Sequence, residues 1–290
     1  MAATKEIRRR IKSIKSTRQI TKAMELVAAA KMRKAQAQTI ATRTYAKLAW
    51  ELIQNLTSRA DQRIHKLLRK SRGKNTAIVL MTSNRGLIGG FNNHIVETAI
   101  EYARKQPRAE FITLGKKGKD AIRKAGFSIG ADFEKKDTTS SVLDINPIAH
   151  LVINDFLQDK YDKVVLVGMS FVSTIVQKPK ILELLPLSSN QRSNYDSDEE
   201  ITFEHPDYIF EPGPDFILDT VLPRLTIMQI YQALLETNAA EHSARMVAMK
   251  NASDAAGDLI SDLTLEYNQL RQANITKEIS EIVAGKLALT

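Results

Sequence analysis

Helix-breaking residues are absent from both ends of this 290-residue chain. Residues 1–72 contain no glycine and no proline, and residues 224–290 contain no proline and only Gly257 and Gly285. All eight prolines and ten of the twelve glycines lie between these two segments. Because glycine and proline disfavour helix more than any other residue, the distribution predicts two long helical arms flanking a compact domain. An arm of about 60 residues would extend about 90 Å and needs a partner along its side.

Both arms carry a heptad seam, which predicts a coiled coil. Alternate steps of four and three residues give one seam near each end of the chain. The first seam consists of Ile7, Ile11, Ile14, Arg18, Thr21, Glu25, Ala28, Met32, Ala35 and Thr39; the second consists of Leu235, Ala239, His242, Met246, Met249, Ser253, Ala256, Ile260, Leu263, Tyr267 and Leu270. An antiparallel pair satisfies both seams, because the two arms leave one folded insert from opposite ends of its sequence.

The arms also carry apolar residues outside the seams. Ile20, Met24 and Val27 form a cluster displaced by about 100° from the first seam. Near the C-terminus, further apolar residues cover more of the helix surface than one seam requires: Ile275, Ile279, Ile282, Val283, Leu287 and Leu289. Either another protein or a third stretch of this chain must cover the first cluster. The apolar C-terminal tip indicates insertion into another protein.

Positive charge is concentrated in the first arm. Residues 1–74 hold 20 Lys or Arg against 4 Asp or Glu, a net charge of +16, whereas the whole chain carries +9. A solvated helix face, nucleic acid, anionic lipid or an acidic protein surface would each explain this excess. The first 44 residues contain no aromatic side chain that could stack on bases, which favours a protein surface over single strands. A basic coiled-coil nucleic-acid-binding protein remains the alternative interpretation.

The cysteine and histidine content excludes several kinds of catalytic and metal-binding site. The chain has no cysteine, which excludes disulfides, thiolate metal ligands and a cysteine nucleophile. Its five histidines show no metal-binding spacing, and no nucleophile, base and orienting acid form a recognisable set. We therefore expect no catalytic residue, no metal and no cofactor. No apolar run is long enough for a direct membrane span.

The insert alternates between strand and helix patterns. Strands are predicted at Thr76–Thr82, Glu110–Leu114 and Lys163–Val167, and helices at 93–104, Lys116–Ala125 and Asn146–Leu157. Such alternation predicts an α/β fold with a mostly parallel sheet. Residues Phe171–Leu184 are expected to be extended, and Ser188–Glu200 to form an acidic loop.

A glycine-rich turn follows the first predicted strand, at Gly86, Gly89 and Gly90. Phosphate-binding loops occupy this position in other proteins, but the turn lacks the lysine and hydroxyl of a Walker loop and the spacing of a dinucleotide fingerprint. A tight turn that packs a helix on the sheet is the better interpretation.

Six segments of the chain, spread over nearly its whole length, form a distinctive set of motifs. They are IKSIKSTRQITKAMELVAAAKMR (11–33), TSNRGLIGGFN (82–92), ILELLPL (181–187), DYIFEP (207–212), EHSARMVAMKN (241–251) and YNQLRQANITKEISEIVAG (267–285). Together these segments resemble the gamma subunit of F-type ATP synthases. This resemblance implies a noncatalytic rotor subunit that couples proton-driven rotation of the membrane ring to ATP synthesis. The implied partners are three alpha and three beta subunits, an epsilon subunit and a ring of c subunits, with no nucleic acid.

The same resemblance implies an arrangement and a set of contact residues. Residues 1–72 would form the N-terminal shaft helix, 73–215 an α/β foot domain and 216–290 the C-terminal shaft helix. The residues expected to contact the alpha and beta subunits are Ile20, Lys22, Met24, Val27, Arg33, Arg245, Arg271, Gln272, Thr276 and Glu278, and those expected to contact epsilon and the c ring are Tyr208 and Glu211. The implied location is the cytoplasmic face of a bacterial cell membrane, reached through the complex.

Overall fold

The fold is described from a computed structural model, which covers residues 2–59, 65–69, 73–136, 141–187 and 214–287. The side chains of residues 2–3, 43–59, 214–217 and 285–287 lie outside the description. The chain forms two compact units. One consists of Met1–Ala28 and Arg245–Thr290, and the other of Ala29–Ala244.

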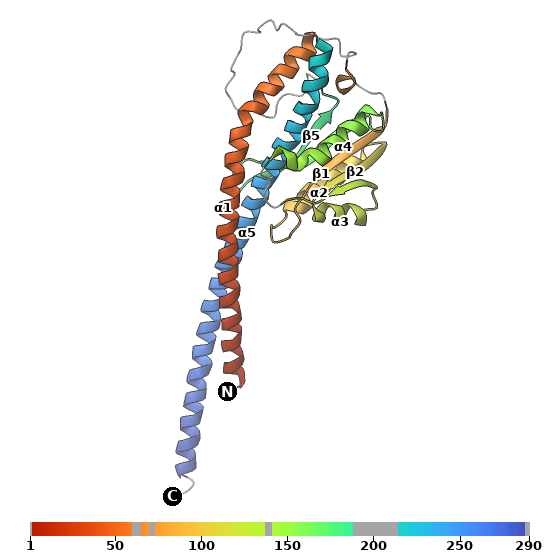
Figure 1. The fold of residues 1–290 in the computed structure, drawn as a ribbon. Coiled ribbons are helices and arrows are strands. Elements are labelled where there is room, and N and C mark those ends of the chain that lie inside the picture. Colours follow the sequence, from red (N-terminus) through yellow and green to blue (C-terminus); the bar gives the residue numbers. More distant parts are fainter. Residues whose placement is uncertain (1, 60–64, 70–72, 137–140, 188–213, 288–290) are drawn as a thin grey trace. The chain divides into compact units, whose positions relative to one another are not determined.

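The first unit is a pair of helices. Its helices are the first part of α1 (Ala2–Arg59) and the last part of α5 (Pro214–Leu287), which run antiparallel with both chain ends at the same end of the pair (Figure 1). On α5, all the predicted seam positions in this unit are buried or half-buried: Met246, Met249, Ser253, Ala256, Ile260, Leu263, Tyr267 and Leu270. The predicted antiparallel coiled coil of the terminal helices is therefore confirmed.

The polar middle of the first seam has a structural explanation. Arg18 is exposed, and its guanidinium carbon lies 3.4 Å from the point where a Cβ on Gly257 would be. The guanidinium therefore lies over Gly257 of the opposite helix, at a distance at which an added Cβ would make ordinary van der Waals contact. On either side of Arg18, seam residues Ile7 and Ala28 are buried, and Ile11 and Ile14 are half-buried.

The second unit contains a five-stranded sheet. In chain order the strands are β1 (Asn75–Met81), β2 (Arg108–Leu114), β3 (Ile129–Phe133), β4 (Lys163–Phe171) and β5 (Gln177–Leu185). Their order in the sheet is β3-β2-β1-β4-β5. Strands β1 to β4 pair in parallel, and β5 pairs with β4 in the antiparallel direction. This mostly parallel sheet confirms the predicted fold class.

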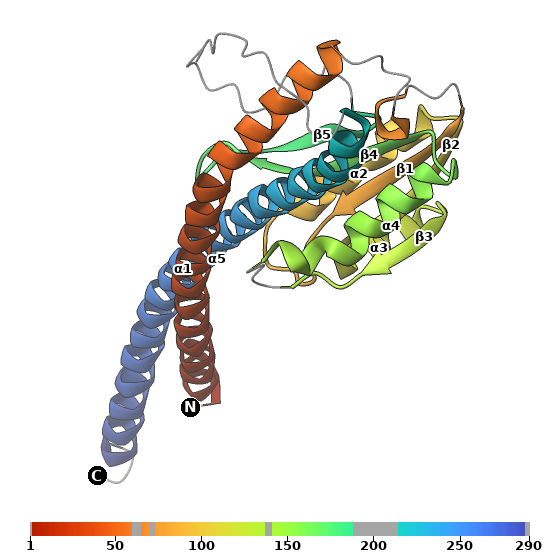
Figure 2. The same ribbon diagram turned by 45° about the horizontal axis from the view of Figure 1, so that its top comes forward.

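Two apolar cores cover the two faces of the sheet (Figure 2). One face carries α2 (Phe91–Arg104) and α3 (Lys116–Lys124), with Phe111 and Val165 beneath them. The other carries α4 (Asn146–Leu157), which the short helix η2 (Val142–Ile145) precedes, together with η1 (Lys66–Leu68) and α5. The central strands β1 and β4 are mostly apolar and buried because both faces of the sheet are covered there, as is usual for parallel sheets.

Within this unit, α1 and α5 continue their contact. Met32 and Ala35 of α1 are buried, as are Leu235, Ala239 and His242 of α5. The hydroxyl of Thr42 also donates a hydrogen bond to Oε1 of Gln232, at 2.7 Å. The seam read from the sequence is therefore buried in this unit as well.

Several element bounds differ from the sequence-based expectation. Helix α4 lies where it was predicted, and α2 begins at Phe91, two residues before its predicted start. Strand β4 extends to Phe171, and β3 was not predicted. Strand β3 is short and contains Gly130, so it carries little strand signal. Helix α5 begins at Pro214 and includes Pro223. The predicted acidic loop Ser188–Glu200 lies outside the described residues.

Candidate partner-contact surfaces

The first candidate surface is the apolar cluster on α1. Ile20 and Val27 are 58% and 56% exposed, and Met24 is half-buried. Because the seam turns toward α5, these side chains are left with large apolar areas in solvent. Covering one such side chain is worth roughly 1.5–3 kcal/mol, so the cluster favours a partner.

Charged residues surround this cluster. Nζ of Lys22 lies 3.0 Å from both carboxylate oxygens of Glu25, a seam residue whose side chain is only 14% exposed. Arg33 is exposed and Arg245 is half-buried. Lys22 therefore already has an intramolecular partner, and an exposed pair of this kind contributes about 0–1 kcal/mol.

The second candidate surface is the C-terminal part of α5. Burial along this helix ends at Asn274, and all described side chains from Ile275 to Ala284 are exposed. They include four large apolar residues, Ile275, Ile279, Ile282 and Val283. The predicted contact residues Arg271, Gln272, Thr276 and Glu278 are exposed on the same stretch. An apolar helix end of this kind is characteristic of a protein-binding segment.

Four other large apolar residues of α1 and α5 are exposed and were not predicted. They are Leu26, Ile40, Leu259 and Leu265, with exposed fractions between 52% and 68%. The signal that could have identified them is their position off the heptad seam. Tyr208 and Glu211, which were expected at the foot, lie outside the described residues.

Charge differs between the two helices of the first unit. Residues 4–28 of α1 carry eight Lys or Arg and two Glu. On α5, Asp254, Asp258, Asp262 and Glu266 follow one another at four-residue spacing, and all four are exposed. Neighbouring like charges at this spacing destabilise a helix by roughly 0.2–0.5 kcal/mol each. The pair therefore has one basic helix and one helix with an acidic stripe.

The glycine-rich turn after β1 is a packed turn. Leu87 and Gly89 have φ values of 62° and 59°, a region that glycine tolerates best. Asn92 closes the turn, because its Oδ1 accepts a hydrogen bond from the backbone N–H of Ser83 at 3.1 Å. A Cβ on Gly90 would lie 2.8 Å from Nε2 of His94. The backbone conformation accounts for Gly89 and the contact with His94 for Gly90, whereas a Cβ on Gly86 would meet no atom within 4 Å.

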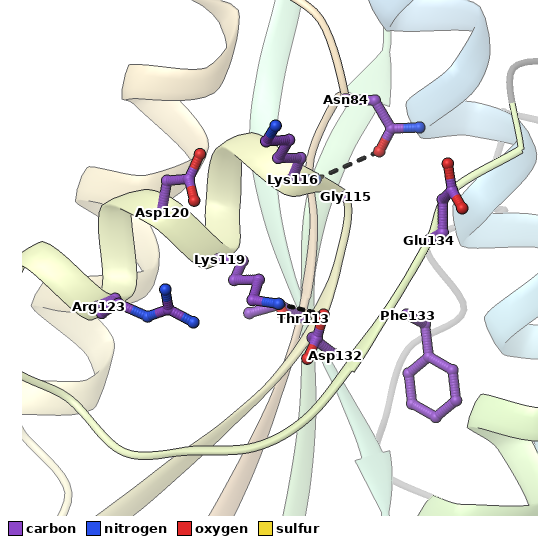
Figure 3. Close-up of a pocket in the computed structure, with 10 residues that line it drawn as sticks. All are labelled: Asn84, Thr113, Gly115, Lys116, Lys119, Asp120, Arg123, Asp132, Phe133 and Glu134. Carbon is purple, nitrogen blue, oxygen red and sulfur yellow. Dashed lines mark hydrogen bonds and ion pairs between the residues drawn. The ribbon is translucent and has the colours of Figure 1, made fainter.

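A pocket of about 350 Å³ lies between β2, β3 and the start of α3 (Figure 3). The N-terminus of α3 has its first N–H groups satisfied: Lys116 donates to Oδ1 of Asn84, Lys117 to the Ser83 carbonyl and Gly118 to Oγ1 of Thr82. Lys119 pairs with Asp132 across the pocket at 2.6 Å. These donors are therefore not aimed at a phosphate, and we assign the pocket no ligand.

Two further observations concern metal binding and membrane spans. Within the described part of the chain, no three His, Asp or Glu side chains are grouped so that they could hold a metal ion. Among the same residues, no helix combines the length and the apolar character needed to cross a membrane.

Comparison with known proteins identifies the family. The family model described as ATP synthase matches residues 3–289. The ATP synthase gamma chains of Chloroflexus aurantiacus and Pelotomaculum thermopropionicum are 40% and 41% identical to this chain, and each alignment covers all of both proteins. That of Roseiflexus castenholzii is 42% identical and covers all of this chain and 99% of the relative.

Solved structures agree with this fold. A chain in the structure of the Tetrahymena thermophila mitochondrial ATP synthase central stalk and c ring is 25% identical, with a TM-score of 0.61 over 81% of this chain and 99% of that one. A chain in the Euglena gracilis mitochondrial OSCP/F1/c-ring structure is 21% identical, with a TM-score of 0.68 over 99% and 95%. The sequence-based resemblance is thereby confirmed, and the chain belongs to the family of ATP synthase gamma chains, the noncatalytic central-stalk subunits of that complex.

Proposed function

We propose that this chain is the central rotor shaft of a bacterial F-type ATP synthase. It turns with the membrane ring and forces the catalytic subunits through their conformations. Residues 1–72 and 216–290 form the shaft, and 73–215 form the foot. The single observation that carries this proposal is the helix pair of a gamma-chain family member, whose α5 continues as an exposed apolar helix past its last half-buried residue, Asn274.

The partners follow from this role. A collar of three alpha and three beta subunits surrounds the helix pair and covers Ile20, Met24, Val27 and the apolar C-terminal end of α5. The foot binds an epsilon subunit and the c ring, with Tyr208 and Glu211 at that contact. The complex holds the chain at the cytoplasmic face of the cell membrane. Relatives in three bacteria support the bacterial setting, and the Tetrahymena structure contains both a central stalk and a c ring.

The asymmetry of the helix pair supports the mechanism. A rotor can change the state of a catalytic subunit only if its contacts favour one conformation over another in each orientation. One helix of the pair is strongly basic, and the other carries the acidic stripe of Asp254, Asp258, Asp262 and Glu266. A beta subunit therefore meets a different charge and a different apolar surface as the shaft turns. Exposed ion pairs are individually weak, which allows each contact to be released.

Co-purification tests the assignment directly. A tagged copy of this chain is extracted with detergent from membranes of its own host. It should co-purify with three alpha and three beta subunits per copy of the chain, together with epsilon and the c ring. Recovery of the chain without these subunits, or together with DNA, would contradict the proposal.

A substitution in the α1 cluster tests the contact surface. Met24→Lys places a second cation two residues from Lys22, on a surface that must meet each beta subunit in turn. We expect proton pumping per ATP hydrolysed to fall at least twofold in membrane vesicles, while assembly is retained. Met24→Leu keeps the apolar surface and should pump like the wild type. Equal pumping by the lysine and leucine variants would show that Met24 is not part of the contact surface.

A further inference from the structure

Helix α5 passes over the edge of the sheet at a topologically special place. The strand order β3-β2-β1-β4-β5 reverses direction between β1 and β4, and in doubly wound sheets the crevice at the carboxyl ends of such strands usually holds a ligand. Here α5 itself lies there. Leu235 packs in the core with α4, whereas Ala240 packs in the core with α2. The helix therefore crosses from one face of the sheet to the other at this edge.

Three polar contacts fix α5 at the crossing. The backbone N–H of Met169, in β4, donates a hydrogen bond to Oγ1 of Thr237 at 3.1 Å. Nζ of Lys135, just after β3, lies 2.5 Å from Oε2 of Glu241. The hydroxyl of Ser243 donates to the carbonyl of Thr174, in the β4–β5 turn, at 2.7 Å. We call Thr237, Glu241 and Ser243, with Lys135, the α5 clamp.

The side chains of the clamp are buried, and the neighbouring backbone leaves room for them. The side chains of Lys135 and Glu241 are 3% and 9% exposed. A Cβ on Gly168 would lie 2.6 Å from Oγ1 of Thr237, so glycine at this position of β4 gives the threonine room to reach the strand. The backbone of Lys135 is also held, because Nδ2 of Asn84 donates to its carbonyl at 2.5 Å. Both members of the ion pair are therefore placed by the frame around them.

Buried polar contacts add directional restraints to the apolar packing of α5. The apolar side chains of α5 are close-packed in the core and already oppose rotation of the helix, and the hydrogen bonds and the ion pair fix its rotational setting further. A buried ion pair adds little net stability over an apolar pair of similar volume, but leaving one of its charges alone is unfavourable. Turning α5 would separate Glu241 from Lys135 and Thr237 from Met169. The clamp is thus better suited to preventing rotation than to stabilising the fold.

We propose that the α5 clamp transmits torque from the sheet domain into α5. The proposal rests on the rotor function proposed above, and it assigns the transmission to positioning residues through their contacts within this chain. Helix α5 is continuous from Pro214 to Leu287, so a helix that is fixed against rotation at residues 237–243 carries the applied twist along its length. The clamp joins it to β4, to the segment after β3 and to the β4–β5 turn.

The test replaces the ion pair by an apolar pair in the assembled complex. Lys135→Met with Glu241→Met keeps the buried volume and removes the directional contact. The readouts are the unfolding temperature of the purified chain, the ATP hydrolysis rate and the protons pumped per ATP in vesicles against a preformed gradient. We expect an unfolding temperature equal to or above that of the wild type, and at least a threefold loss of pumping per ATP under load.

Rescue and control variants complete the test. The exchange Lys135→Glu with Glu241→Lys restores an ion pair and should recover at least half of the lost pumping. Lys119→Met with Asp132→Met removes an ion pair in the same domain that does not involve α5, and it should pump like the wild type. Pumping by the Lys135→Met/Glu241→Met variant at the wild-type level under the same load would overturn the proposal.

A second arm of the experiment is independent of the ion pair. Thr237→Val keeps the shape of the side chain and removes the acceptor for the N–H of Met169, and we expect at least a twofold loss of pumping under load. If the double methionine variant does not assemble, this variant decides, and wild-type pumping by it overturns the proposal. If the wild-type chain itself supports no pumping, it is the rotor function that fails.

Discussion

At the scale of single residues, His65 joins α5 to the start of the sheet domain. Its Nδ1 accepts a hydrogen bond from the N–H of Leu67 at 3.1 Å, and its Nε2 lies 3.0 Å from Oδ1 of Asp219. Burial lowers the pKa of His65, and the neighbouring Asp219 offsets this only in part. The neutral imidazole is therefore the form that the fold favours, with Nδ1 as acceptor and Nε2 as donor.

Protonation of His65 should destabilise the sheet domain. The pKa of His65 in the folded state lies below its value of about 6.5 in the unfolded chain, so the unfolded state binds more protons between these two values. The free energy of unfolding should therefore rise with pH through that window and fall as the pH drops below about 6.5. Urea unfolding at pH 5 and at pH 7.5 measures the difference.

Two variants separate His65 from other histidines. His65→Asn retains a side-chain acceptor for the N–H of Leu67 but cannot be protonated in this range, so its stability should depend less on pH. His150→Asn removes an exposed imidazole and should keep the wild-type dependence. The same pH dependence in the His65→Asn variant and the wild type would show that another group is responsible.

At the scale of elements, the exposed end of α5 should be the part that holds the shaft in its collar. Burial of one isoleucine is worth roughly 1.5–3 kcal/mol, so Ile279→Asp should raise the dissociation constant of the chain from an alpha and beta hexamer by roughly ten- to a hundredfold. Fluorescence of a labelled chain titrated with the hexamer measures this constant.

A neighbouring position provides the matched control for Ile279. Ser280→Asp adds the same charge to the same turn of α5 without removing apolar surface, so its effect should be much smaller. Similar losses of affinity for Ser280→Asp and Ile279→Asp would mean that charge, and not burial of the isoleucine, determines the binding.

Local patterns explain which elements could be predicted. The heptad seams, α2 and α4 follow from periodicity within one segment, and the structure contains all of them, with Arg18 of the first seam exposed and α2 beginning two residues early. Strand β3 was missed because its signal is weak. The α5 clamp could not be predicted, because Lys135 and Glu241 are 106 residues apart in sequence and meet only in the folded domain. The partner-contact residues could be proposed from the family resemblance, and their contacts remain predictions.

At the scale of the whole molecule, charge should control how the chain meets its collar. Residues 4–28 carry a net charge of +6, and all the Lys and Arg residues among them are exposed. Attraction between exposed charges is screened over about 8–10 Å at ionic strengths of 0.1–0.15 M, and it acts mainly on the rate of association. An acidic collar surface would therefore bind the chain more slowly as salt is raised.

Neutralising one helix or the other gives opposite results under this interpretation. Arg8→Gln, Arg9→Gln and Arg10→Gln together should slow association with an alpha and beta hexamer at about 50 mM salt by roughly tenfold, and should flatten its salt dependence. Asp254→Asn with Asp258→Asn removes charges of the opposite sign from α5 and should leave the rate unchanged or raise it. Stopped-flow fluorescence at several salt concentrations measures both rates. If the arginine variant associates at the wild-type rate at low salt, the positive charge of α1 has no part in assembly, and the apolar residues of the two surfaces would have to direct it alone.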